Sequence, residues 1–152
     1  MKLTIHRNHS TSLYTMGMLR INQEKRCVQT VENTLTMLPP GAYGVHLSSA
    51  SDHSRRIVIT LPENATSPPK TGRPPILARF HPDGSYRTAR KLQAICLGEL
   101  LIPGALKKGV EVYTRLFDRL EKAEKRHEPI TLFISERGMK KGKPIRHWGG
   151  DE

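Results

Sequence analysis

The stretch LPPGAYGVHL, residues 38–47, decides the fold class of this chain. Its Pro-Pro-Gly triplet at 39–41 predicts a turn, because proline has no N–H to donate to a sheet and glycine tolerates positive φ. Beyond the turn, Tyr43, Val45 and Leu47 alternate with small or polar residues. This period of two is typical of a half-buried strand, so the stretch predicts a turn that leads into β structure.

Further strands are predicted on both sides of this stretch. Residues 57–61 are rich in β-branched side chains and should pair with residues 43–47 as a hairpin. Residues 2–7, 13–21 and 27–31 are three closely spaced segments of β character, separated by polar breaks. Their spacing indicates an antiparallel meander at the N-terminus.

The second half of the chain adds strands around one helix. Strands are predicted at residues 76–81, 94–97 and 130–134. Between residues 109 and 126, apolar side chains recur at steps of three and four, which gives the apolar stripe of an amphipathic helix. The sequence therefore predicts an α+β fold: a mostly antiparallel sheet, open or curled into a barrel-like half, with the 109–126 helix packed on it.

The chain is predicted to form a single domain. Its 152 residues fit the usual size of one domain, and residues 1–136 carry all the predicted helices and strands. Residues 62–75 are rich in proline and lack periodicity, so they are interpreted as a loop insertion. Residues 137–152 are rich in Lys and Gly and are interpreted as a basic, flexible tail.

The net charge of +11, from 25 Lys and Arg against 14 Asp and Glu, indicates an anionic partner. Nucleic acid, anionic cell-wall polymers and acidic proteins all fit, and a basic surface that only favours solubility is the alternative. No apolar stretch approaches the roughly 20 residues of a membrane helix, so no membrane association is expected. Without an apolar signal segment and with two cysteines, the chain is expected in the cytoplasm, or released by a route that needs no signal peptide. The sequence indicates no cofactor and leaves the oligomeric state open.

Several motifs in a fixed order carry a resemblance to a known family. They lie at residues 12–19 with 29–32, 38–45, 78–81 and 94–98. In this order they resemble a family of small bacterial and phage domains of unassigned function, with a proline-x-glycine-x-tyrosine turn, a histidine strand and a cysteine strand. The match covers about residues 3–136. The histidine-then-cysteine arrangement is similar to the L,D-transpeptidases (YkuD-like), which cross-link peptidoglycan and are mostly β with one long helix.

The resemblance implies Cys96 as a nucleophile and His81 as its general base. A thiolate attacks an amide carbonyl, and a neighbouring imidazole lowers the pKa of the thiol and moves the proton. Main-chain N–H groups near Leu97 and Gly98 would then stabilise the oxyanion. On this interpretation the chain is a cysteine-dependent acyl transferase or hydrolase that acts on a peptidoglycan amide.

The sequence before Cys96 departs from the transpeptidase pattern. Gln93, Ala94 and Ile95 stand where active transpeptidases have serine or threonine, histidine and glycine. Ile95 in place of glycine would crowd the nucleophile, and a free cysteine within an apolar run is usually a small core residue. These departures favour a degenerate site on a transpeptidase-like scaffold that acts as a binding module.

The histidines do not predict a metal site. The chain has seven, and only His6 and His9 have a ligand-like spacing on one element. Because zinc takes about four ligands in a closed geometry, no metal is expected.

Basic side chains cluster near His81 and in the tail. The predicted binding residues near His81 are Arg79, Arg87, Arg90, Lys91 and, as a stacking aromatic, Tyr86. The tail carries Arg137, Lys140, Lys141, Lys143 and Arg146 beside Trp148. Such clusters bind phosphates without reading sequence, and a nearby aromatic ring stacks on bases. A nucleic-acid-binding module is therefore a further hypothesis, against the alternative of a solvated face and a free tail.

Overall fold

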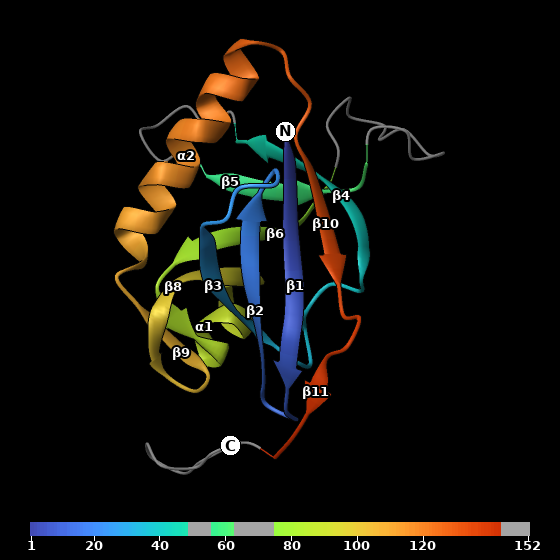
Figure 1. Cartoon of the computed structure of the whole chain (residues 1–152), viewed down its shortest axis with the longest axis vertical. Helices are drawn as coiled ribbons and strands as arrows, with labels where there is room; N and C mark the ends of the chain where they lie inside the picture. The colour runs from blue at the N-terminus through green and yellow to red at the C-terminus, as the bar shows by residue number, and fades with distance from the viewer. Residues whose placement is uncertain (49–55, 63–74, 144–152) are drawn as a thin grey trace.

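A closed ring of strands forms the centre of this computed structural model, which describes residues 1–48, 56–62 and 75–143 (Figure 1). Within the described residues, the order around the ring is β3-β2-β1-β10-β4-β5-β6-β8, and pairing of β8 with β3 closes it. The ring strands are β1 (Lys2–Ser10), β2 (Tyr14–Ile21), β3 (Cys27–Asn33), β4 (Gly41–Leu47), β5 (Ile57–Thr60), β6 (Ile76–Pro82), β8 (Ala94–Ile102) and β10 (Thr131–Ser135). The short strands are β7 (Gly84–Ser85), β9 (Ala105–Lys107) and β11 (Lys140–Lys141), and the helices are α1 (Tyr86–Leu92) and α2 (Gly109–Lys125).

The predicted α+β class and the barrel-like character of the sheet are confirmed. Pairing is mostly antiparallel: β1, β2 and β3 form the expected meander, and β4 and β5 form the expected hairpin with Val45 opposite Ile59. Two ring pairs are parallel, β1 with β10 and β6 with β8. The first of these sets Leu3 beside Leu132 and joins the two ends of the described chain.

The main core fills the inside of the ring. Alternate residues of each strand point inward, as the period-two pattern requires. The buried members come from the strands and from α2: Leu3, Ile5, Leu19, Tyr43, Val45, Leu47, Ile57, Ile59, Ala78, Phe80, Ile95, Leu97, Leu116, Leu120, Ala123, Ile130, Leu132 and Ile134. Each large aliphatic side chain contributes about 1.5–3 kcal/mol when it leaves water, so this cluster is the main source of stability.

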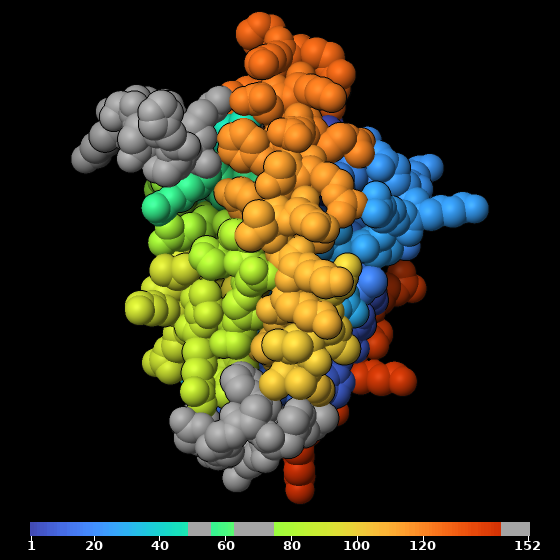
Figure 2. Space-filling model, turned by 90° about the vertical axis from the view of Figure 1, so that its left-hand side faces the viewer, coloured from blue at the N-terminus to red at the C-terminus, as the bar shows by residue number. Residues whose placement is uncertain are grey.

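Helix α2 confirms the predicted amphipathic helix and packs against β4, β6 and β8. It runs along the face of the molecule that Figure 2 shows. Leu116, Leu120 and Ala123 bury its apolar stripe. At its start the carboxylate of Asp83 accepts a hydrogen bond from the N–H of Gly109, which satisfies one free donor of the first turn.

Helix α1 was not predicted. Ser85 caps it: its hydroxyl accepts from the N–H of Arg87 at 3.2 Å, and Thr88 completes the capping box. The helix ends at Gln93, which takes a left-handed conformation with φ of 50°. Helix α1 has only about two helical turns, and its buried residues are Tyr86 and Ala89. This apolar pattern is too short to predict a helix from the sequence.

The C-terminal segment is in part a strand. Lys140 and Lys141 pair with β1 in parallel, and the N–H of Gly142 donates to the carbonyl of Ser10 at 2.8 Å. The predicted flexible tail therefore begins with an ordered strand, and residues 144–152 lie outside the described residues. The same holds for residues 63–74 of the predicted proline-rich insertion. No helix in the described ranges is both long and apolar enough to cross a bilayer.

Candidate functional site

Cys96 and His81 are neighbours in the sheet. β6 and β8 are parallel, and His81 lies opposite Cys96 in their register. Phe80 and Ile95 point into the main core, so His81 and Cys96 point to the outer face of the ring, beneath α1. The proximity of the predicted pair is thus a feature of the fold.

The environment of Cys96 is that of a core thiol. Its side chain is fully buried in a second apolar cluster with Tyr14, Val31, Tyr86 and Leu106. Burial raises the pKa of the Cys96 thiol to about 12, and the negative charges of Glu32 and Asp83 add to the shift. The thiol is therefore protonated near pH 7, whereas a nucleophilic cysteine needs a lowered pKa.

The other parts of the predicted catalytic site are also enclosed. Leu97 pairs with Thr30 on one side and with Pro82 on the other, so its peptide lies inside the sheet. The Nδ1 atom of His81 is buried and has no hydrogen-bond partner among the described residues. The catalytic role of His81 and Cys96 stays a prediction, and this geometry does not favour it.

The predicted basic residues near His81 meet at a surface groove. Arg87, Arg90 and Lys91 lie on α1 at positions i, i+3 and i+4, which place them on one side of the helix. They line a groove of about 680 Å³. Its other lining residues are Leu13, Asn33, Leu35 and Tyr86. We call this feature the α1 groove.

The wall opposite α1 is a loop that is bonded to both ends of the helix. The side-chain N–H of Asn33 donates to the carbonyl of Tyr86 at 2.9 Å, and its side-chain oxygen accepts from the N–H of Leu35 at 2.9 Å. After the helix, the side-chain amide of Gln93 donates to the carbonyl of Thr36 at 2.7 Å. The groove is therefore a preformed feature held by side-chain to backbone hydrogen bonds.

Two predicted binding residues have contacts within the fold. Tyr86 is 6% exposed, lines the groove and packs on Tyr14 at a ring-centroid distance of 6.0 Å, so its ring forms part of the floor of the groove. Arg79 does not line the groove; its Nε donates to the carbonyl of Leu92 at 3.1 Å and holds the end of α1 on β6. Of the predicted basic binding residues, Arg87, Arg90 and Lys91 line the groove.

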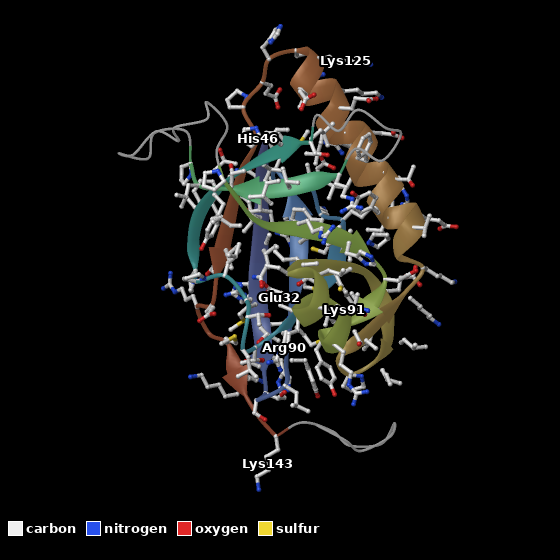
Figure 3. All side chains as sticks on the ribbon, turned by 180° about the vertical axis from the view of Figure 1, so that it is seen from behind. Glu32, His46, Arg90, Lys91, Lys125 and Lys143 are labelled. Carbon is white, nitrogen blue, oxygen red and sulfur yellow. The ribbon has the colours of Figure 1, made fainter. Side chains whose placement is uncertain are left out.

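Basic side chains line the α1 groove. No lining residue in the described part of the chain is acidic, and Arg90 and Lys91 are exposed on its rim (Figure 3). The guanidinium of Arg87 lies 5.7 Å from the centre of the Tyr86 ring, in cation–π range. A concave surface with exposed cations such as Arg90 and Lys91 attracts phosphate or carboxylate groups.

Sequence reasoning missed three lining residues and one buried ion pair. Leu13, Asn33 and Leu35 come from other parts of the chain and carry no motif. Arg7 is fully buried and donates to both oxygens of Glu32, at 2.8 and 2.6 Å. The position of Arg7 in β1 could have indicated this pair. Leu3 and Ile5 point inward, so Arg7, two residues further along the strand, also points inward, and a buried charged side chain requires a partner.

The ion pair extends to the C-terminal segment. A third nitrogen of Arg7 donates to Glu136 at 2.8 Å. Although burial lowers the pKa of Arg7, hydrogen bonds and charge from Glu32 and Glu136 raise it overall, so Arg7 stays a cation. Arg7 thus binds Glu136, the first residue of the segment that connects β10 to β11.

Comparison with known proteins finds no matching family model, no matching curated protein and no matching solved structure. In the described residues no three His, Cys, Asp or Glu side chains form a group that could hold a metal ion.

Proposed function

We propose that this chain is a binding module that holds the phosphate backbone of nucleic acid in the α1 groove. One observation carries the proposal: the exposed side chains of Arg90 and Lys91 line one groove, and Arg87 lines it as well. Arginine forks fit phosphate oxygens in a two-point arrangement, and lysine adds a mobile positive charge. A cytoplasmic location, where nucleic acid is available and thiols stay reduced, goes with this proposal.

The apolar part of the groove favours nucleic acid over a cell-wall polymer. Leu35 is 71% exposed beside the cations, and Leu13 lines the same groove. A base offers a flat apolar face to such side chains while its phosphates reach the cations. A polyol-phosphate chain offers only the charges. The exposed leucine is therefore better explained by a nucleotide ligand.

Binding of this kind does not depend on sequence. The described lining of the groove has cations and apolar side chains, and its one side-chain amide, that of Asn33, is bonded within the fold and is not available to read base edges. Affinity should then fall steeply with salt, with a slope of about 0.7 for each phosphate contact to a single strand.

The test is fluorescence anisotropy of a labelled 20-nucleotide oligothymidylate between 50 and 200 mM salt. Replacing Arg90 and Lys91 by glutamine should weaken binding about tenfold and lower the salt slope by about 1.4. The matched control replaces Lys122 and Lys125, two exposed cations on α2, and should change the affinity much less. Equal losses in both double variants would mean that net charge alone is responsible, and competition by polyglycerol phosphate as strong as by oligonucleotide would point to a cell-wall polymer.

A second candidate function is amide chemistry at Cys96 on a transpeptidase-like scaffold. The observation that favours it is the β6–β8 register, which sets His81 beside Cys96. In this scheme the Cys96 sulfur bonds to the amide carbon, its proton passes through His81 to the leaving amine, and the C–N bond breaks. A thiol-reactive probe at pH 7 decides: an enzyme labels faster at Cys96 than at the more exposed Cys27, whereas slower labelling of Cys96 ends this candidate.

A further inference from the structure

The C-terminal segment that contains β11 carries a second group of cations. Arg137, Lys140, Lys141 and Lys143 are all exposed. Pairing with His9 and Ser10 fixes Lys140 and Lys141 beside the end of β1. These lysines are therefore part of a defined surface of the barrel.

One turn connects β11 to the α1 groove. Ser10, at the end of β1, accepts a hydrogen bond from Gly142 on its β11 side. Three residues later, Leu13 lines the groove. On the groove side the same turn is bonded to Thr34, whose hydroxyl donates to the carbonyl of Thr11 at 2.8 Å. Residues 10–13 thus separate two basic surfaces by the width of one turn.

The described segments that build this part of the molecule contain no acidic residue. Residues 8–21, 33–47, 84–98 and 137–143, which build the groove, the turn and β11, contain no Asp or Glu. Four carboxylates flank these segments. Glu32 and Glu136 accept hydrogen bonds from the buried Arg7, Asp83 accepts one from the N–H of Gly109, and Glu99 lies 4.0 Å from Lys108. Acidic residues are instead frequent on α2, where Glu111, Asp118, Glu121 and Glu124 lie. The charge of the chain is therefore divided between two regions.

Figure 3 shows that the cations of the α1 groove and the C-terminal segment lie in the same half of the molecule. Arg90, Lys91 and Lys143 lie in the lower half of that view, at the end where β11 joins β1, and Lys125 lies at the opposite end on α2. A linear polyanion bound at the α1 groove can continue past the turn at residues 10–13 and reach the lysines of β11.

We propose that the α1 groove and the β11 lysines form one continuous track for a single strand of nucleic acid, with residues 10–13 as its centre. This inference rests on the proposed function, and it adds that the ligand is longer than the groove. The track extends beyond the groove of about 680 Å³, so it accommodates a longer strand than the groove alone. For comparison, single-strand binding proteins of the OB-fold type cover about 4–16 nucleotides per fold.

The experiment compares two probes on two double variants. The probes are a labelled 20-nucleotide oligothymidylate, measured by anisotropy, and a trinucleotide of thymidine, measured by NMR shifts of the α1 amides. Lys140→Gln with Lys141→Gln should weaken the 20-nucleotide probe about tenfold at 0.1 M salt and leave the trinucleotide shifts unchanged. Arg90→Gln with Lys91→Gln should weaken both probes.

The outcomes separate the two proposals. If the groove variant weakens both probes and the β11 variant weakens neither, the groove binds but the track does not exist. If the groove variant changes neither probe, the proposed function itself fails. If the β11 variant weakens the long probe no more than Lys122→Gln with Lys125→Gln does, the effect is one of net charge and the track is rejected. Circular dichroism of each variant shows whether it is folded.

Discussion

The guanidinium of Arg7 holds the carboxylate of Glu32 by two hydrogen bonds, at 2.8 and 2.6 Å, and both side chains are almost completely buried. They join β1 to β3 across β2, inside the ring. The next carboxylate along this network, Glu136, is 29% exposed and begins the segment that leads to β11. One buried cation therefore links the interior of the barrel to the proposed binding surface.

Loss of one partner from this pair should be costly. We expect Arg7→Met to lower the free energy of unfolding by about 3–5 kcal/mol, because it leaves the buried Glu32 charge without a partner. The double variant Arg7→Met with Glu32→Met should recover much of that loss. Chemical denaturation measures both. The control is Arg119→Met, which breaks an exposed two-point ion pair with Glu24 and should lower the free energy of unfolding by about 1 kcal/mol or less. If Arg7→Met costs no more than this control, the Arg7–Glu32 pair is not a buried pair that stabilises the fold.

Removing the outer carboxylate should release β11 without unfolding the barrel. In Glu136→Gln we expect amide hydrogen exchange to speed up about tenfold at Gly142, which donates to Ser10, while global stability changes little. Glu99→Gln is the matched control, since its carboxylate lies 4.0 Å from Lys108 on the surface. Unchanged exchange at Gly142 would show that the strand pairing alone holds β11.

The buried thiol should make stability depend on alkaline pH. The folded pKa of Cys96, about 12, lies above the unfolded value near 9, so the folded state keeps its proton where the unfolded chain loses it. The contribution of the protonated Cys96 thiol to the free energy of unfolding is complete below pH 9. Between pH 9 and 12 this contribution is lost, by up to about 1.4 kcal/mol per pH unit. Urea denaturation from pH 7.5 to 10.5 should show a steeper fall for the wild type than for Cys96→Ala. Parallel curves would mean that the thiol is not held in the core.

The exposed leucine of the groove should matter for binding and not for folding. Leu35→Ala removes apolar contact worth about 1 kcal/mol to a bound base, which corresponds to about fivefold in affinity for the 20-nucleotide probe. Val110→Ala changes another side chain that is more than half exposed, on α2, and should leave affinity unchanged. If Leu35→Ala binds as the wild type does, the groove recognises phosphate alone.

Local patterns in the sequence predicted the local parts of the fold. Alternation around Tyr43 and Ile59 predicted the β4–β5 hairpin, and the apolar stripe at Leu116 and Leu120 predicted α2. Closure of the ring was not predictable, because it joins strands far apart in the chain, such as Val31 with Cys96, and nothing local encodes that register.

The candidate site was predicted only in part, because some of its residues are close in sequence and others are brought together only by the tertiary fold. Arg87, Arg90 and Lys91 were identified because they are close in sequence, although the helix that aligns them was not. Leu13 and Leu35 reach the groove only through tertiary contacts, and no local pattern marks them. The proposed stacking role of Tyr86 does not agree with its burial, because an aromatic ring beside a charge cluster in sequence can equally form the floor beneath it.

The central claim is that the α1 groove binds nucleic acid, and NMR mapping tests it most directly. Titration of the full chain with a 20-nucleotide oligothymidylate at 50 mM salt should shift the backbone amides of Leu13, Asn33, Leu35, Arg90 and Lys91, and the shifts should reverse at 500 mM salt. Amides of α2 should not move. Shifts confined to α2, or no shifts at low salt, would contradict the claim.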